Sequence, residues 1–163
     1  MRVINAPHPF DMKLGEISVF LAGSIEMGKA ELWQDKMINQ FSDVENVVFL
    51  NPRRPDWDNS WLCTKDSPPF REQVEWEQDG LLGVADTVFF YFSPGTVSPI
   101  SLLELGECLL AHVYLKVPRK LIVVCPEGYS RKGNVDITTE RWNLPVYESL
   151  NAGIIALKKL CLE

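Results

Sequence analysis

The stretch ISVFLA at residues 17–22 decides the fold, because it is a short apolar run that ends in the turn dipeptide Gly23-Ser24. Similar apolar runs follow along the chain: VVFL at 47–50, TVFFYF at 87–92 and LIVVC at 121–125. Segments with helical spacing separate them, which is typical of buried parallel strands joined by crossover helices. With a short fifth strand near Val146, the sequence predicts an α/β fold, an open, doubly wound, five-stranded parallel sheet with helices on both faces.

Apolar residues at intervals of three and four predict the helices, which are expected over residues 28–41, 70–84, 100–114 and 149–160. The chain of 163 residues has the length of a single domain, 1–163. Residues 1–15 contain two prolines and little periodicity, so they are expected to form an irregular N-terminal arm. The polar residues 126–134 are expected to form a loop.

Composition excludes several classes of protein. The chain has 16 Lys and Arg against 22 Asp and Glu, a net charge of −6, which disfavours binding to a nucleic-acid backbone. It contains no long apolar segment and no cationic leader, so neither a membrane span nor a signal peptide is expected. The four cysteines form no C-x-x-C pair and are interpreted as reduced core thiols of a cytoplasmic protein; they are Cys63, Cys108, Cys125 and Cys161.

No cofactor is expected from the motifs. The chain contains neither G-x-G-x-x-G nor G-x-x-x-x-G-K-[ST], which argues against a dinucleotide cofactor and against P-loop chemistry. His8 and His112 stand alone, without the ligand spacing of a metal site.

Ligands of doubly wound sheets bind beyond the carboxyl ends of the strands, so the loops that follow the strands are the candidate site. Glu104 lies in the most apolar predicted helix, where a desolvated carboxylate is costly unless it is paired or used. Helping to cap the helix is the simpler explanation. A polar run on the preceding helix faces the same edge and either meets Glu104 or forms a solvated face; it comprises Gln73, Glu75, Glu77, Gln78 and Asp79.

Two further loops carry candidate binding residues. The turn at Gly23-Ser24 can offer backbone N–H groups to an anion or a sugar hydroxyl. The long loop at 51–69 exceeds the length at which loops are usually functional or disordered, about 12 residues. In this loop Trp57 either stacks on a nucleobase or anchors the loop, and Arg53 either contacts a ligand or pairs with the acidic surface.

The chain resembles the nucleoside 2-deoxyribosyltransferase family over about residues 17–125. The resemblance lies in five motifs in order: FLAGSI at 20–25, NPRR at 51–54, QVEWE at 73–77, Ala85-Asp86 and SPISLLELG at 98–106. It implies a flavodoxin-like fold, assembly into a homo-oligomer whose sites can borrow residues from a neighbouring subunit, and no metal or organic cofactor. The implied partners are a small nucleoside or nucleotide and a free nucleobase.

The resemblance also implies catalytic roles. The residue matching Glu104 is the nucleophile that attacks C1′ of deoxyribose and forms a covalent glycosyl enzyme, while a proton donor helps the base to leave. The family's second carboxylate aligns with Gln78, and acids lie on either side of it. Of these, Glu77 is favoured as the proton donor and Asp79 is the alternative.

The substrate is less closely specified. Transferases of the family carry an aspartate for the 5′-hydroxyl six positions before the nucleophile, whereas this chain has Ser98, as do related 2′-deoxynucleoside 5′-phosphate N-glycosidases. The leading hypothesis is a deoxyribosyltransferase; the alternatives are such a hydrolase or a catalytically silent nucleotide-binding module. The implied sugar-side contacts are Gly23, Ser24, Ile25 and Ser98, and the further substrate contacts are Asn51, Arg53, Trp57 and Gln78.

Overall fold

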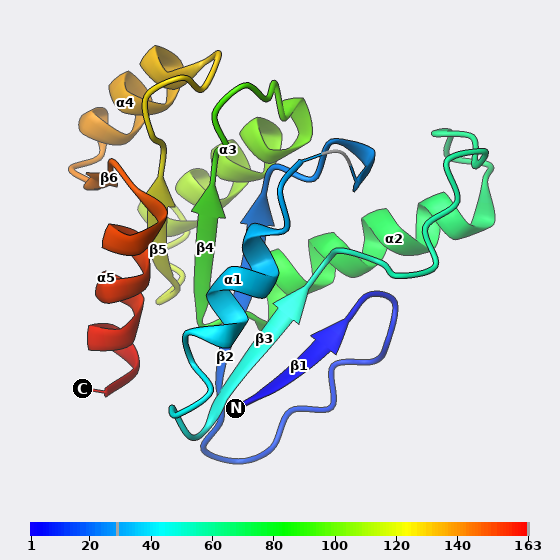
Figure 1. Cartoon of the computed structure of the whole chain (residues 1–163), viewed down its shortest axis with the longest axis horizontal. Coiled ribbons are helices and arrows are strands. Elements are labelled where there is room, and N and C mark those ends of the chain that lie inside the picture. The colour runs from blue at the N-terminus through cyan, green and yellow to red at the C-terminus, as the bar shows by residue number, and fades with distance from the viewer. Residues whose placement is uncertain (29, 163) are drawn as a thin grey trace.

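The computed structural model describes residues 1–28 and 30–162, and within them the strands form one parallel sheet (Figure 1). The strand order is β1-β3-β2-β4-β5-β6. The strands are β1 (Arg2–Asn5), β2 (Ile17–Gly23), β3 (Val47–Asn51), β4 (Thr87–Tyr91), β5 (Lys120–Val124) and β6 (Val146–Tyr147). The predicted doubly wound, flavodoxin-like fold class is confirmed, with six strands in the described residues rather than five.

Helices cover both faces of the sheet (Figure 1). They are the 3₁₀ turn η1 (Glu26–Gly28), α1 (Trp33–Asn39), α2 (Pro68–Asp79), the π-helical turn η2 (Gly80–Val84), α3 (Pro99–Val113), α4 (Lys132–Arg141) and α5 (Leu150–Leu162). Helices α1 and α5 pack on one face, and α2, α3 and α4 pack on the other. None of the helices in the described residues is long and apolar enough to cross a membrane.

The alternation of side chains along β2 explains this two-sided core. Phe20 belongs to the cluster that contains α2 and α3, whereas Leu21 belongs to the cluster that contains α1 and α5. Both side chains are fully buried, so a central strand of this sheet has no polar face. Its sequence is therefore a continuous apolar run, which is why it could be recognised.

The first fifteen residues are not the irregular arm that was expected, because β1 lies within them and pairs with β3. Only one of its four residues is buried, so this short edge strand lacks the long apolar run of the central strands. The expected loop at 126–134 runs instead into α4, a polar helix in which Val135 and Thr139 are the buried residues.

The first helix and the cysteines also differ from expectation. Gly28 has a φ of +83°, which is incompatible with a helix starting there, and α1 begins only at Trp33. Lys29, within the predicted helix, lies outside the described residues. Cys108 and Cys125 are buried core thiols, but Cys63 is exposed and Cys161 is half-buried.

The strand order places the topological switch point of the sheet between β2 and β4. The chain leaves β2 for β3 on one side and returns past β2 to β4 on the other, so the connections diverge at this point. In doubly wound sheets, ligands bind beyond the carboxyl ends of the strands at this switch point. The loop after β2, the loop after β4 and the start of α3 therefore frame the candidate site (Figure 1).

Candidate active site

The close approach of β2 and β4 at the site depends on Gly23. This residue pairs with Tyr91 and has a φ of +140°. A Cβ atom at this position would lie only 2.2 Å from the carbonyl oxygen of Tyr91, so no other residue fits without a shift of the backbone. Ser24 N donates a hydrogen bond to the same oxygen at 3.0 Å. Gly23, a predicted sugar contact, thus sets the position of both loops.

A cluster of hydroxyl groups joins the loop after β2 to the loop after β4. Ser24 is fully buried, and its Oγ accepts hydrogen bonds from Ser93 N at 2.9 Å and from Ser98 Oγ at 2.7 Å. Thr96 Oγ1 lies 2.8 Å from Ser24 Oγ and completes the cluster. Ser24 and Ser98 were predicted as sugar contacts, and here they are hydrogen-bonded to each other. Ile25, which follows Ser24 in the chain, is half-buried.

Glu26 reaches from η1 to the start of α3, a contact that no sequence motif indicated. Its Oε1 accepts hydrogen bonds from Val97 N at 3.0 Å and from Ser98 N at 2.7 Å. Glu26 and Ser98 have φ values of 51° and 41°, in the left-handed region. This conformation costs a residue other than glycine on the order of 1 kcal/mol, so the surrounding contacts must hold both residues in place.

A second acid missed by the sequence analysis, Glu31, lies beside the end of β4. Its carboxylate accepts hydrogen bonds from Tyr91 Oη at 2.8 Å and from Ser93 Oγ at 3.1 Å. A 2.6 Å ion pair with Lys36 is the main cause of its lowered pKa. Burial and this neighbouring carboxylate raise the pKa of Tyr91 to about 12, so the phenol remains a hydrogen-bond donor at neutral pH.

Glu104 on α3 and Glu77 on α2 form the electrostatic centre of the site. Burial raises the pKa of Glu104 well above its usual value, and the charges of Glu77 and Glu107 raise it further. Burial also raises the pKa of Glu77, to about 7. Both side chains nevertheless remain partly accessible. Within residues 1–28 and 30–162, Glu104 makes no hydrogen bond or ion pair, so a cost of desolvation is not offset by a partner.

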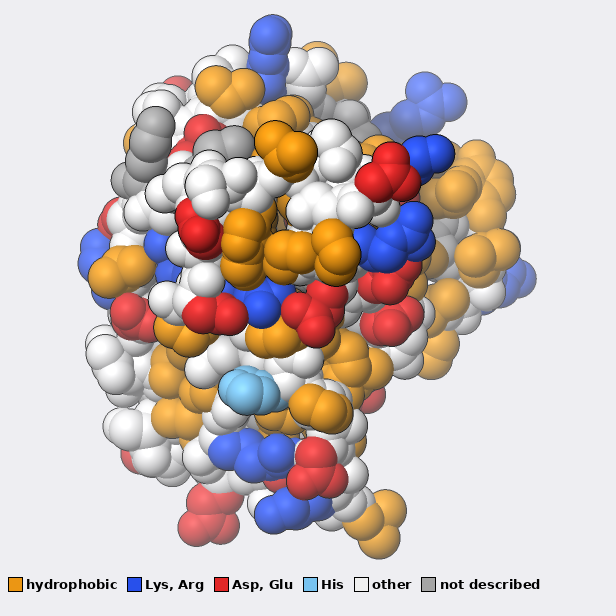
Figure 2. All heavy atoms as spheres, turned by 90° about the vertical axis from the view of Figure 1, so that its right-hand side faces the viewer, with side chains coloured by type: hydrophobic (Ala, Val, Ile, Leu, Met, Phe, Trp, Pro, Cys, Tyr) orange, Lys and Arg blue, Asp and Glu red, His pale blue; other side chains and the backbone are white. Residues whose placement is uncertain are grey.

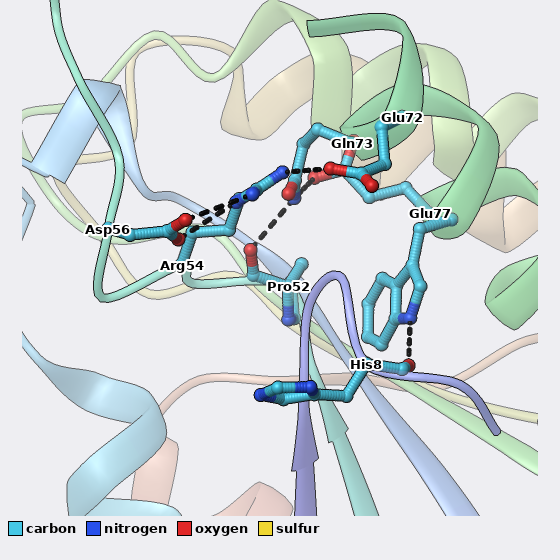
Figure 3. Close-up of polar contacts among 8 residues, drawn as sticks. His8, Pro52, Arg54, Asp56, Glu72, Gln73 and Glu77 are labelled. Carbon is cyan, nitrogen blue, oxygen red and sulfur yellow. Dashed lines mark hydrogen bonds and ion pairs between the residues drawn. The ribbon is translucent and has the colours of Figure 1, made fainter. Parts of the chain in front are cut away.

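Gln73 fixes the carboxyl group of Glu77. Its Nε2 donates hydrogen bonds to Pro52 O and to Glu77 Oε1, both at 2.8 Å (Figure 3). The side chain is buried, and its Oε1 has no hydrogen-bond partner among the described residues. The bond from Gln73 lowers the pKa of Glu77, partly opposing the effect of burial. Sequence analysis had noted Gln73 only as one member of a polar run.

The other two members of this run predicted at the site have a different environment. Gln78 and Asp79 are both exposed, whereas Glu77 is half-buried. Glu77 is the acid of α2 whose charge raises the pKa of Glu104. Burial and the effect of its charge on the pKa of Glu104 therefore favour Glu77 over Asp79 as the neighbour of Glu104.

Asn51 and Arg53, which were predicted as substrate contacts, connect the end of β3 to its neighbours. Asn51 Nδ2 donates to Asn5 Oδ1 at 3.0 Å, and Asn51 Oδ1 accepts from Arg53 N at 3.2 Å. The Arg53 guanidinium reaches Gln34 Oε1 at 3.3 Å and Glu31 O at 3.2 Å. Burial lowers the pKa of Arg53. The side chain thus supports the segment before α1.

Trp57 belongs to a loop that is held by its own side chains. Its ring meets that of Trp61 edge-on at 5.2 Å, and Arg54 lies 5.1 Å from the centre of the Trp61 ring. Arg54 also pairs with Asp56 at 3.0 Å and with Glu72 on α2 at 2.9 Å (Figure 3). Apolar, acidic and basic side chains are intermixed on this side of the molecule (Figure 2). Trp57 is half-buried, which leaves part of its ring accessible.

The arrangement is suited to proton transfer and covalent catalysis by two carboxyl groups. Neighbouring carboxyl groups that cannot both ionise easily retain a proton between them at neutral pH. In the described part of the chain, no three His, Cys, Asp or Glu side chains are grouped as metal ligands.

The fold and this site define a flavodoxin-like α/β protein with paired carboxyl groups beside its switch point. The family profile described as "nucleoside 2-deoxyribosyltransferase like" matches residues 16–129, which is more than half of the chain and includes both Glu77 and Glu104. The chain belongs to this family, and the resemblance stated from its motifs is confirmed. No curated protein shows a significant match.

Proposed function

We propose that this protein is a nucleoside 2-deoxyribosyltransferase, which cleaves the N-glycosidic bond of a 2′-deoxynucleoside and transfers the deoxyribose to another nucleobase. The observation that carries the proposal is the pair formed by Glu104 and Glu77, whose pKa values are both raised. Membership of the family supports N-glycosidic chemistry.

In the first half-reaction, a carboxylate oxygen of Glu104 forms a bond to C1′ of the sugar. The bond between C1′ and the base nitrogen breaks, its electron pair goes to the base, and the base takes the proton of Glu77. The product is a covalent glycosyl ester on Glu104, as in retaining glycosidases. Glu104 lies in the second turn of α3.

The second half-reaction reverses these steps with a different base. A nitrogen of the acceptor base attacks C1′ and displaces Glu104, while Glu77, now ionised, takes the proton that this nitrogen loses. Glu77 suits both roles because its pKa of about 7 leaves both of its forms populated near neutral pH. Glu104 must be ionised to attack, so the reactive form of the pair carries its proton on Glu77.

The remaining predicted residues divide between the two ends of the substrate. Residues 23–25 and Ser98 are proposed to frame the sugar, because they belong to the loops that follow β2 and β4 at the switch point, where Ser98 Oγ donates a hydrogen bond to Ser24 Oγ. Asn51, Arg53, Trp57 and Gln78 are proposed to shape the base side, directly or by supporting neighbouring loops.

The test is a base-exchange assay with a deoxynucleoside and a different free base, followed by chromatography. The wild-type chain should produce the new deoxynucleoside. Glu104→Gln should abolish exchange, and Glu77→Gln should slow it by about 10²-fold or more, the usual contribution of a general acid. Glu75→Gln, on an exposed position of the same helix, is the matched control and should retain full activity.

Intact-protein mass spectrometry should detect a deoxyribosyl adduct in the wild type and not in Glu104→Gln. Unchanged exchange in Glu104→Gln would refute the mechanism. Asp79→Asn decides between the two candidate proton donors, because a loss of activity there and not in Glu77→Gln would assign the role to Asp79. Release of free base without a new nucleoside would instead identify a hydrolase.

A further inference from the structure

The choice between a nucleoside and a nucleotide as substrate depends on what occupies the start of α3. A 5′-phosphate bound there would need hydrogen-bond donors, and backbone N–H groups at a helix N-terminus are the usual donors to phosphate. In this protein, the N–H groups of Val97 and Ser98 already donate to a carboxylate oxygen of Glu26. The carboxylate of Glu26 thus occupies the N–H donors that a phosphate would need.

The hydroxyl groups around this contact are also engaged within the protein. Ser98 Oγ donates to Ser24 Oγ at 2.7 Å and lies 3.3 Å from Glu26 Oε1. Ser98 is only 6% exposed, so its hydroxyl is not presented to solvent as a phosphate ligand. The loop between β4 and α3 is also held by Tyr129, whose Oη donates a hydrogen bond to Val97 O at 2.8 Å.

The contact between Glu26 and Ser98 lies close enough to Glu104 for one deoxyribose to reach both, with C1′ at Glu104 and its 5′ end at Glu26. Ser98 and Glu104 are six residues apart, which is about 9 Å along a helix. Side chains of a helix lean toward its N-terminus, so the carboxyl group of Glu104 extends back toward Ser98. In the proposed binding mode, a deoxyribose whose C1′ meets Glu104 has its 5′ end at the start of α3, next to Ser98 and Glu26.

A carboxylate at this point distinguishes the two kinds of 5′ end. It accepts a hydrogen bond from a neutral 5′-hydroxyl, because a carboxylate has about four acceptor positions. It repels a phosphate dianion, which carries charge of the same sign and would compete for the same N–H donors.

We propose that Glu26 is a specificity-determining residue that selects substrates with a free 5′-hydroxyl and rejects 5′-phosphates. This inference rests on the proposed function for the position of the sugar. In this proposal Ser98, whose presence in the sequence suggested phosphate binding, instead holds the carboxylate of Glu26 through its backbone N–H group.

The test compares a deoxynucleoside with its 5′-monophosphate as glycosyl donor, using the full chain and a constant acceptor base. The wild type should have the higher kcat/KM for the nucleoside. Glu26→Gln retains an oxygen acceptor for the two N–H groups and removes the charge, so the ratio of monophosphate to nucleoside kcat/KM should rise about tenfold or more. Glu127→Gln removes the same charge from an exposed position on another loop and should leave the ratio unchanged.

Calorimetric titration with inorganic phosphate provides a readout that does not depend on turnover. Glu26→Gln should bind phosphate at least about tenfold more tightly than the wild type and Glu127→Gln. Equal phosphate affinities, an unchanged substrate ratio or a wild-type preference for the monophosphate would each overturn the role of Glu26. Absence of turnover with every donor would refute the proposed function, and the phosphate titration would still decide the role of Glu26.

Discussion

Replacing Gln73 by methionine should raise the pKa of Glu77 and shift the pH dependence of activity to higher pH. The substitution removes the hydrogen bond from Nε2 to Glu77 Oε1, which stabilises the ionised carboxylate. Burial then acts unopposed by this bond, and the pKa of Glu77 rises above its present value of about 7. A protonated Glu77 persists to higher pH.

The size of the effect follows from the strength of the lost bond. Hydrogen bonds to charged groups contribute about 1.5–3 kcal/mol, and one pKa unit corresponds to about 1.4 kcal/mol. Because Glu77 is partly accessible, the lower end applies, and the expected rise is about one pH unit. Pro52 O also loses its donor, which should lower the free energy of unfolding by about 1 kcal/mol.

The assay is the pH profile of kcat/KM for base exchange. The wild-type rate should fall as pH rises through the pKa of Glu77, because the general acid is lost. In Gln73→Met, this basic limb should shift upward while the maximum rate declines. Gln40→Met, which removes an exposed amide at the end of α1, is the control and should keep the wild-type profile. A basic limb in the same place for Gln73→Met and the wild type would refute the link between Gln73 and Glu77.

Two further predictions concern stability. The folded-state pKa of Glu77 is raised from 4.5 to about 7, so its contribution to stability is fully present below pH 4.5 and is lost as pH rises through 7. At alkaline pH, Glu77→Gln should therefore have a higher melting temperature than the wild type. The gain in the free energy of unfolding is below about 3 kcal/mol, because Glu77 is partly accessible to solvent. Equal melting temperatures at alkaline pH would contradict the raised pKa. Gly23→Ala should destabilise the fold by about 3 kcal/mol or more, measured by denaturant unfolding, because its Cβ would meet Tyr91 O at 2.2 Å and its φ is +140°. Gly133→Ala, with open space around it in α4, should stabilise the fold by up to about 1 kcal/mol, and a similar result at Gly23 would refute the steric argument.

The central strands were predictable because both of their faces are buried. Most positions of β2 and β4 are buried apolar side chains, so each strand contains a continuous apolar run in the sequence. The edge strand β1 has one buried residue in four, and its sequence is not distinctive. Helix α4 is also polar over most of its length and depends on tertiary contacts of Val135.

The candidate site was only partly predictable for a related reason. Glu104 could be recognised locally, since a carboxylate within an apolar helix is conspicuous in the sequence. The contact of Glu26 with Ser98 joins residues 72 positions apart, and that of Gln73 with Pro52 joins residues 21 positions apart. Such contacts depend on how the loops meet at the end of the sheet, which no local spacing encodes.

The N-terminal segment after β1 contacts α2 next to Glu77, although the two are far apart in the sequence. Trp76 Nε1 donates a hydrogen bond to His8 O at 2.8 Å (Figure 3). The Trp76 ring stacks on the Phe10 ring, with 4.7 Å between their centroids. Trp76 and Glu77 are consecutive residues of α2, so the segment that contacts the indole is attached to α2 one residue before Glu77. Changes in residues 6–12 are therefore expected to alter the position of Glu77, the proposed proton donor, without changing any of the proposed substrate contacts.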